Sequence, residues 1–371
     1  MLNRVVIQNF KSIGEPGVDL ELKPLTFLVG PNGGGKSSIV EAILMAFTPG
    51  SVDGRHIQLP WFDMSVPVEW LLHADKQGRR SATQITLHIQ AITAAADNYP
   101  PASRNVPSSL ALRAVYTLNT QESNYSIEPP TARERFATEA GKVFLTQSTR
   151  GNVNPGEDVV PLSRIRSPGV RGEFLIPYLT MLSGSNEFAS QLNEIVRWAE
   201  LFGINDLKAG LQRSALRGNR LGADYFDPQL LAQMPLALAS SGSRQVLTVI
   251  AQVLGCPSGS LVMVEEPEIS LHPQAQIDMM ELFGEVIRDG KQIIATTHSH
   301  YLLMAIGYAV QKKWISRDDV AVYHVEKKAE TGTEAKLLKL GKDGYLKDWV
   351  PSYNEVERRL MKAWPKVQAE Q

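Results

Sequence analysis

A glycine-rich segment near the N-terminus most constrains the fold of this chain. Residues 30–37 read Gly-Pro-Asn-Gly-Gly-Gly-Lys-Ser, which matches the pattern G-x-x-x-x-G-K-[ST]. The segment follows a short apolar run, Leu25–Val29, and precedes Ser38–Phe47, where apolar residues recur at helical spacing. Strand, glycine loop and helix in this order predict a phosphate-binding loop. The alternative is a plain glycine-rich turn, but the strand and the helix flank the pattern on the correct sides.

The residue types in this loop suit nucleotide phosphates and Mg²⁺. Glycines let backbone N–H groups come close to phosphate oxygens, and the following helix points its positive end at them. We expect Lys36 to reach the β and γ phosphates and the Ser37 hydroxyl to ligate Mg²⁺. The predicted nucleotide-binding residues of the loop are Asn32, Gly33, Gly34, Gly35, Lys36, Ser37 and Ser38.

A second candidate group lies far downstream, where the apolar run Leu261–Val264 ends in Glu265 and Glu266. A P-loop enzyme needs a carboxylate at the end of a neighbouring strand for Mg²⁺ and a base for the attacking water. The two acids are candidates for both tasks. The alternative is that both acids have no catalytic role and simply lie in solvent at the end of the strand.

Two further motifs flank the acidic strand. His298 follows the next predicted strand, Gln292–Thr296, where an imidazole can donate to a γ-phosphate or to the attacking water. Taken alone, a histidine is more often structural, and its position one strand after the acids favours a functional role. Residues 240–245 open a predicted helix, Ser243–Leu254, and form either a simple N-cap or a second anion site.

The remaining segments predict a chain that alternates between sheet and helix. Alternating runs at residues 82–92 and 110–118 predict an antiparallel sheet, and apolar spacing at 174–202 and 206–216 predicts helices. The predicted elements of the last third are a helix at 243–254, strands at 261–264 and 292–296, helices at 273–288 and 301–311, and a small β extension at 320–326 and 336–340. The pattern indicates an α/β fold around a parallel sheet.

Composition excludes several classes of protein. The 371 residues carry a net charge of −1, which gives no bulk electrostatic argument for nucleic acid. A single cysteine permits no internal disulfide, and no apolar run reaches the ~20 residues of a membrane helix. Because the N-terminus also lacks the features of a secretion signal, we expect a cytoplasmic protein without a membrane partner.

Together these motifs resemble those of ABC-type ATPase heads of the SMC/RecF/OLD group, closest to OLD-like ATPases without a Toprim nuclease domain. Ser240–Gln245 is similar to the ABC signature, and His298 is similar to the switch histidine. Further similar phrases are Ile7–Ile13 before the loop, Glu265–Glu268 with Leu271–Pro273 as Walker B and D-loop, and Gly341–Trp349 in the tail. Glu265 stands where the Walker B acid is usually an aspartate.

This resemblance implies a P-loop NTPase fold of ABC type, with a mixed central sheet, an antiparallel β arm and an inserted helical lobe. The implied parts are residues 1–150 with the loop and the arm, 151–239 as the helical lobe, 240–311 with signature, Walker B and switch histidine, and 312–371 as a C-terminal extension.

The resemblance also implies a division of roles. Such heads form a head-to-tail homodimer with ATP between the subunits, and Ser240 and Gly242 would then bind phosphate across the interface. Lys36, Glu266 and His298 would be catalytic, and Ser37, Glu265 and Gln147 would hold Mg²⁺. Gln147 is the candidate Q-loop glutamine, for which Arg150 is a rival and an ordinary polar loop residue is the alternative.

The expected function is ATP hydrolysis that drives or gates a separately encoded effector, in DNA repair or antiphage defence. The alternative is an ATP-gated scaffold that holds a toxin or nuclease and turns over little ATP. A third hypothesis is direct DNA binding by a run of basic residues without acids, the last three of which lie at helical spacing on one face. The alternative is that these residues form an ordinary solvated face. These basic residues are Lys208, Arg213, Arg217 and Arg220.

Overall fold

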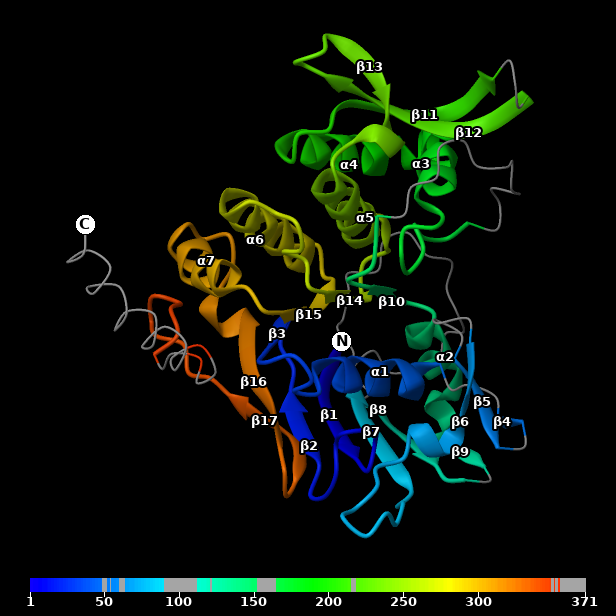
Figure 1. Cartoon of the computed structure of the whole chain (residues 1–371), viewed down its shortest axis with the longest axis vertical. Coiled ribbons are helices and arrows are strands. Elements are labelled where there is room, and N and C mark those ends of the chain that lie inside the picture. The colour runs from blue at the N-terminus through cyan, green and yellow to red at the C-terminus, as the bar shows by residue number, and fades with distance from the viewer. Residues whose placement is uncertain are drawn as a thin grey trace, which may run out of the picture. The chain divides into compact units, whose positions relative to one another are not determined.

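The computed structural model describes residues 1–48, 52–53, 55–59, 64–89, 112–120, 122–151, 165–214, 218–347, 350 and 353. The chain divides into two compact units (Figure 1). One comprises residues 2–140 and 296–371, and we call it the loop unit because it contains the glycine loop. The other comprises residues 141–295 with Met1, and we call it the acidic unit because it contains Glu265 and Glu266.

The loop unit contains a five-stranded antiparallel sheet in the order β2-β1-β7-β8-β9. Its strands are β1 (Leu2–Gln8), β2 (Val18–Glu21), β7 (Thr83–Ile89), β8 (Leu112–Leu118) and β9 (Ser123–Glu128). Side chains along β8 alternate between buried and more exposed, as expected for a sheet with one covered face. Helix α1 (Lys36–Phe47) packs against β7 and β8 and covers that face.

The loop unit contains a second set of paired strands, and one of these strands leads into the glycine loop. Strand β3 (Leu25–Val29) is buried at every position and pairs in parallel with β16 (Val320–Lys328). Strand β17 (Gly332–Leu337) continues antiparallel to β16. The remaining elements of this unit are α2 (Arg133–Ala140), α7 (His300–Gln311), a small sheet of β4 (Val52–Asp53), β5 (His56–Leu59) and β6 (Met64–Pro67), and 3₁₀ turns at Val68–Trp70, Pro130–Ala132 and Arg317–Asp319.

The acidic unit is built around strand β14 (Leu261–Glu265), which pairs in parallel with β10 (Val143–Thr146) and has β15 (Gln292–Thr297) as its other neighbour. Helix α5 (Ser241–Gly255) packs against β10 and β14, and it also contacts the other helices of the unit. These are α3 (Leu175–Ser183), α4 (Ala189–Leu201) and α6 (Pro273–Arg288).

The helix predicted over residues 206–216 is wrong. Residues Asn205–Ser214 form strand β11, which pairs antiparallel with β12 (Gly218–Asp227), and β13 (Ala232–Pro235) completes a three-stranded sheet (Figure 1). Gly210 weakens a helix, and pairing with β12 supplies hydrogen bonds that the periodicity of one segment does not reveal. Lys208, Arg213 and Arg220 therefore lie on strands and share no helix face, and Arg217 lies outside the described residues.

Where the structure describes them, the other predicted elements are confirmed in type, with bounds that shift by a few residues, and residues 90–92 and 110–111 of the predicted runs lie outside the described residues. The mixed α/β fold class is confirmed as well. The expected four-part division of the chain stays a prediction. Among the described helices, none combines the length and the apolar character that a membrane span requires.

Candidate active site

The glycine loop leads from strand β3 into helix α1. Gly30 has a φ of 154° and Gly35 has a φ of 106°, conformations that other residues rarely adopt. A Cβ atom on Gly30 would clash with the carbonyl oxygen of Val325, and one on Gly35 would clash with Oγ1 of Thr333. The loop therefore needs glycine at both positions, which brings its backbone close to strands β16 and β17.

Lys36 is the first residue of helix α1, and its ammonium group lies against the loop. The residue is 6% exposed, and Nζ donates hydrogen bonds to the carbonyl oxygens of Gly30 at 2.9 Å and Pro31 at 3.0 Å. These bonds offset the cost of burying the charge. The first turn of α1 contains no acidic residue. A fixed positive charge and a positive helix end thus meet at one loop, which favours a multiply charged anion.

The two serines after Lys36 lie in different surroundings. Ser37 is exposed, whereas Ser38 is half-buried. The Oγ atom of Ser38 lies 3.1 Å from Oγ of Ser12, which hydrogen-bonds to Oγ1 of Thr333 at 2.8 Å. Ser37 therefore suits a cation bound beside the loop, and Ser38 belongs to a network of hydroxyl groups that supports the loop.

Strand β14 ends at the acid pair in the acidic unit. Both glutamates are half-buried, and Oε2 of Glu265 accepts a hydrogen bond from the backbone N–H of Ser148 at 3.4 Å. Glu266 has a φ of 45°, which is uncommon for a residue other than glycine. Backbone strain of this kind is concentrated at functional sites.

The buried side chain of Arg150 connects the acid pair to two other motifs. It is 3% exposed, and Nη1 donates to the carbonyl oxygens of Glu265 at 2.6 Å and Gln147 at 3.1 Å. Its Nη2 donates to the carbonyl oxygen of Glu266 at 2.8 Å, and its Nε donates to that of Gln245 at 3.3 Å. One guanidinium group thus holds the end of β14, the end of β10 and the first turn of α5.

Burial and the nearby carboxylates have opposite effects on the pKa of Arg150. Burial lowers the pKa of Arg150 to about 10, and the carboxylates of Glu268, Glu266 and Glu265 act in the opposite direction. The guanidinium therefore remains charged at neutral pH and keeps all its donor groups.

The predicted metal ligand Gln147 is already engaged by a neighbour. Its side-chain oxygen accepts a hydrogen bond from Nε of Arg171 at 2.9 Å, and its backbone N–H donates to the carbonyl oxygen of Val170 at 2.9 Å. A role in metal binding requires that Oε1 exchange the Arg171 hydrogen bond for a ligand bond, or accept both.

The signature-like segment forms the N-terminus of helix α5. Ser240 is exposed and caps the helix, because its Oγ accepts a hydrogen bond from the backbone N–H of Ser243 at 3.1 Å. Gly242 is buried, and a Cβ atom there would lie 2.5 Å from the carbonyl oxygen of Ser270. The glycine allows this close approach, while Ser240 presents the helix end to the solvent.

His298 lies between strand β15 and helix α7 in the loop unit, and it is half-buried. The backbone around it is fixed on both sides. Oγ1 of Thr297 accepts a hydrogen bond from the N–H of Ser299 at 2.9 Å, and Oγ of Ser299 caps α7 through the N–H of Leu302 at 3.1 Å. A histidine held at a strand end in this way has a defined backbone position.

Family models match the segment that contains the glycine loop and the segment that contains the acid pair and His298. The family model described as "AAA domain, putative AbiEii toxin, Type IV TA system" matches residues 160–305, and another described as "AAA domain" matches residues 4–66.

Two curated proteins resemble the chain in sequence. The OLD nuclease of Thermus scotoductus is 27% identical over 342 residues, which is 81% of this chain and 59% of that protein. A retinal-specific phospholipid-transporting ATPase of Homo sapiens is 28% identical over 129 residues, which is 34% of this chain and 5% of that protein. The chain thus spans less than two thirds of the length of either relative.

Solved structures of SMC heads share the fold. An SMC head bound to the C-terminal winged-helix domain of ScpA has a TM-score of 0.60 at 15% identity, covering 92% of this chain and 98% of that one. The SMC head of Thermotoga maritima has a TM-score of 0.52 at 15% identity, covering 91% and 99%. The resemblance to ABC-type ATPase heads of the SMC and OLD type is confirmed.

An ATPase head of this type uses parts that here belong to two units. The glycine loop and His298 belong to the loop unit, whereas Gln147, the acid pair and the signature-like segment belong to the acidic unit. Within the acidic unit, Arg150 brings three of these parts together. The structure thus joins the acid pair to its neighbours, and the role of each residue stays a prediction.

The donor atoms of the predicted metal ligands fit Mg²⁺. Ser37 offers a hydroxyl oxygen and Glu265 a carboxylate, the hard oxygen ligands that this ion prefers. Among the described residues, no cluster of three or more His, Cys, Asp or Glu side chains could hold a metal ion.

Sequence reasoning missed two residues that contact the predicted site residues. Thr333 lies far from the loop in sequence, yet its Oγ1 hydrogen-bonds to the carbonyl oxygen of Gly34 at 3.1 Å as well as to Ser12. Arg171 orients Gln147. Neither residue belongs to a motif, so only the tertiary structure reveals them.

Proposed function

We propose that this ATPase domain binds ATP with Mg²⁺ and hydrolyses it to ADP and phosphate. The observation that carries the proposal is the buried Lys36 ammonium group, which is held against a glycine loop at the positive end of α1. That arrangement suits a triphosphate, and the resemblance to SMC and OLD-type ATPases supports the choice of nucleotide.

The loop unit would bind and orient the phosphates. Lys36 would exchange its carbonyl partners for phosphate oxygens, and the N–H groups of residues 33–37 would donate to the same anion. Ser37 would hold the metal, and bound Mg²⁺ neutralises charge on the phosphate oxygens. His298 would donate a hydrogen bond to the γ-phosphate or to the attacking water.

The acidic unit would supply the group that accepts the proton of that water. We assign this role to Glu266 and assign Glu265 to the metal. Water attacks the γ-phosphorus, the bond to the bridging oxygen breaks, and the proton moves to the Glu266 carboxylate. Arg150 supports the assignment because it fixes the main chain of both glutamates.

The cycle would act through a homodimer that closes around ATP, with Ser240 and Gly242 binding the nucleotide of the partner subunit. The exposed position of Ser240 at the N-terminus of α5 supports this role. Closure and opening would drive or gate an effector protein in the cytoplasm. The family model that names a toxin–antitoxin system and the similarity to an OLD nuclease favour antiphage defence, with DNA repair as the other role.

ATP hydrolysis by the purified protein tests the proposal. We expect Mg²⁺-dependent release of phosphate, and we expect light scattering to detect a dimer when ATP is present. Loss of nucleotide binding in Lys36→Ala would assign the activity to the glycine loop. A wild-type protein that neither binds ATP nor releases phosphate would contradict the proposal.

A second candidate function is an ATP-gated scaffold for a separately encoded toxin or nuclease. The observation that favours it is again the match to a model named for a toxin–antitoxin system. A scaffold predicts co-purification with the product of a neighbouring gene, unaffected by Glu266→Gln. An ATP-driven machine predicts that this substitution changes the complex.

Direct DNA binding receives less support than these two functions. Lys208 lies on strand β11 and forms an ion pair with Asp206 at 2.6 Å. A filter-binding experiment at increasing salt concentration tests direct DNA binding. Contacts to DNA phosphates would make the affinity fall steeply with salt.

A further inference from the structure

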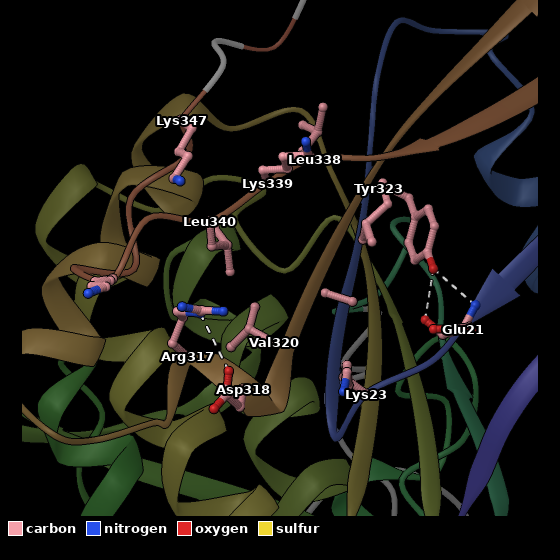
Figure 2. Close-up of a pocket in the computed structure, with 13 residues that line it drawn as sticks. Glu21, Lys23, Arg317, Asp318, Val320, Tyr323, Leu338, Lys339, Leu340 and Lys347 are labelled. Carbon is pink, nitrogen blue, oxygen red and sulfur yellow. Dashed lines mark hydrogen bonds and ion pairs between the residues drawn. The ribbon is translucent and has the colours of Figure 1, made fainter.

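A pocket of about 470 Å³ lies in the loop unit, and none of the predicted nucleotide-binding residues lines it. Its walls come from the start of strand β16, the segment that follows β17, and the chain near the end of β2 (Figure 2). In Figure 2, Lys347 and Lys23 lie on opposite sides of the hollow, with Val320 and Leu340 between them in this view. This volume is ordinary for a binding site.

The side chains at the rim make the pocket positive. Five basic residues line it against two acidic ones, and Asp318 lies 3.4 Å from Nε of Arg317. The basic residues are Lys23, Arg317, Lys339, Lys342 and Lys347, and the other acidic residue is Glu21. Within the described part of the chain, Lys339, Lys342 and Lys347 form no ion pair. Several ammonium groups that line one pocket attract a ligand with several negative charges.

The inner wall of the pocket is apolar. Val320, Ala321 and Leu338 are each no more than 6% exposed, and Leu340 is half-buried. Tyr323 fixes this wall, because its hydroxyl group hydrogen-bonds to both the backbone N–H and the carbonyl oxygen of Glu21 at 2.9 Å (Figure 2). The pocket therefore combines an apolar wall with lining residues that carry a net positive charge.

We propose that this pocket binds a short acidic peptide segment of a partner protein, with an apolar side chain placed between its carboxylates. A purely phosphate ligand would use the lysines and leave the apolar wall in contact with water. A purely apolar ligand would displace water from the lysine ammonium groups without supplying a negative charge, which costs free energy. Only a ligand with both features matches the two parts of the wall. This inference does not depend on ATP hydrolysis.

The test measures binding of a short fluorescent peptide of Asp and Glu with one central Leu, by anisotropy with the full chain. We expect the double variant Lys339→Glu/Lys342→Glu to bind at least about tenfold more weakly, and Lys347→Glu to weaken binding as well. Replacing the peptide Leu by Ser should weaken binding about tenfold, since an apolar side chain leaves the wall. Lys76→Glu, an exposed lysine in a turn of the same unit, is the matched control and should bind as the wild type does.

Three results would overturn the inference. The first is equal affinity of the charge-reversal variants and the wild type, once circular dichroism has verified that the variants fold. The second is equal affinity of the Leu and Ser peptides. The third is binding of inorganic triphosphate or an oligonucleotide, but not of the peptide, at the same lysines. Lys36→Ala should leave peptide affinity unchanged, which separates this site from the glycine loop, and peptide binding would survive even if the protein hydrolysed no ATP.

Discussion

Nη2 of Arg150 donates a hydrogen bond of 2.8 Å to the backbone carbonyl oxygen of Glu266. The same guanidinium donates to the carbonyl oxygen of Glu265 at 2.6 Å. Both acceptors belong to the main chain, so Arg150 fixes the path of the chain through the acid pair. This position would matter for catalysis because a general base acts only within hydrogen-bonding reach of its proton.

Arg150→Lys should lower both stability and turnover. Arg150 donates to four carbonyl oxygens, whereas a lysine ammonium group has three N–H donors on a single nitrogen, so at least one carbonyl oxygen loses its partner. We expect unfolding in urea to show a loss of about 2–4 kcal/mol. We expect kcat for ATP to fall at least about tenfold, with KM changing less, because Arg150 acts on the main chain of the acid pair.

The matched control for Arg150→Lys is Arg113→Lys, which changes an exposed arginine that pairs with Glu128 at the surface. An exposed ion pair contributes little, so the free energy of unfolding should stay within about 0.5 kcal/mol of wild type. If Arg150→Lys kept wild-type stability and kcat, the buried hydrogen bonds would not position the acids.

The sequence predicts those elements whose conformation is determined by a local pattern of residues. The run Leu25–Val29, the glycine loop and helix α1 follow one another in the chain, and their bounds agree closely with the prediction. The buried strands β14 and β15 are predictable for a similar reason, because a short run rich in Val and Ile favours a buried strand.

Contacts between distant segments could not be predicted in this way. Arg150 lies 115 residues from Glu265, and Thr333 lies 299 residues from Gly34. A polar residue in a loop has no pattern that reveals such a partner. Strand β11 illustrates the same point, since it owes its conformation to pairing with β12 rather than to its own periodicity.

Glu266→Gln should separate ATP binding from hydrolysis. The amide keeps the shape of the side chain but does not accept the proton of the attacking water, and loss of a general base costs roughly 10²–10⁴-fold in rate. We expect kcat to fall by at least about a hundredfold while labelled ATP still binds, and we expect the dimer to accumulate in light scattering.

The control for this substitution is Glu200→Gln, on the exposed surface of helix α4, which should hydrolyse ATP at the wild-type rate. Wild-type turnover in Glu266→Gln would refute the role of Glu266 as the base, and His298 would become the next candidate for that role.

Gly35→Ala should disrupt the glycine loop. Its φ of 106° is strained for alanine, and the new Cβ atom would clash with Oγ1 of Thr333. We expect a loss of stability of about 1–2 kcal/mol and an affinity for ATP at least about tenfold weaker by calorimetry. Gly210→Ala in strand β11 is the control, because a Cβ atom there would have no neighbouring atom within 4 Å and the φ of Gly210 is not positive. Similar ATP affinities of the two variants would show that the loop tolerates a side chain.

His324 should make stability depend on pH. It is 2% exposed on strand β16, and burial lowers its pKa in the folded protein, with Lys336 and Lys36 acting in the same direction and Glu326 against it. The unfolded chain then binds a proton near pH 6.5 that the folded chain does not, so the free energy of unfolding should decrease as pH falls below this value.

The measurement compares urea unfolding of the wild type and His324→Gln at about pH 7.5 and about pH 5.5, on either side of the usual histidine pKa. The difference between the proteins at the higher pH gives the structural cost of the substitution. Because glutamine does not titrate, the variant should lose less stability than the wild type between the two pH values, by up to about 1.4 kcal/mol for one proton over this range. An equal loss in both proteins would mean that His324 binds its proton equally well in the folded and unfolded states.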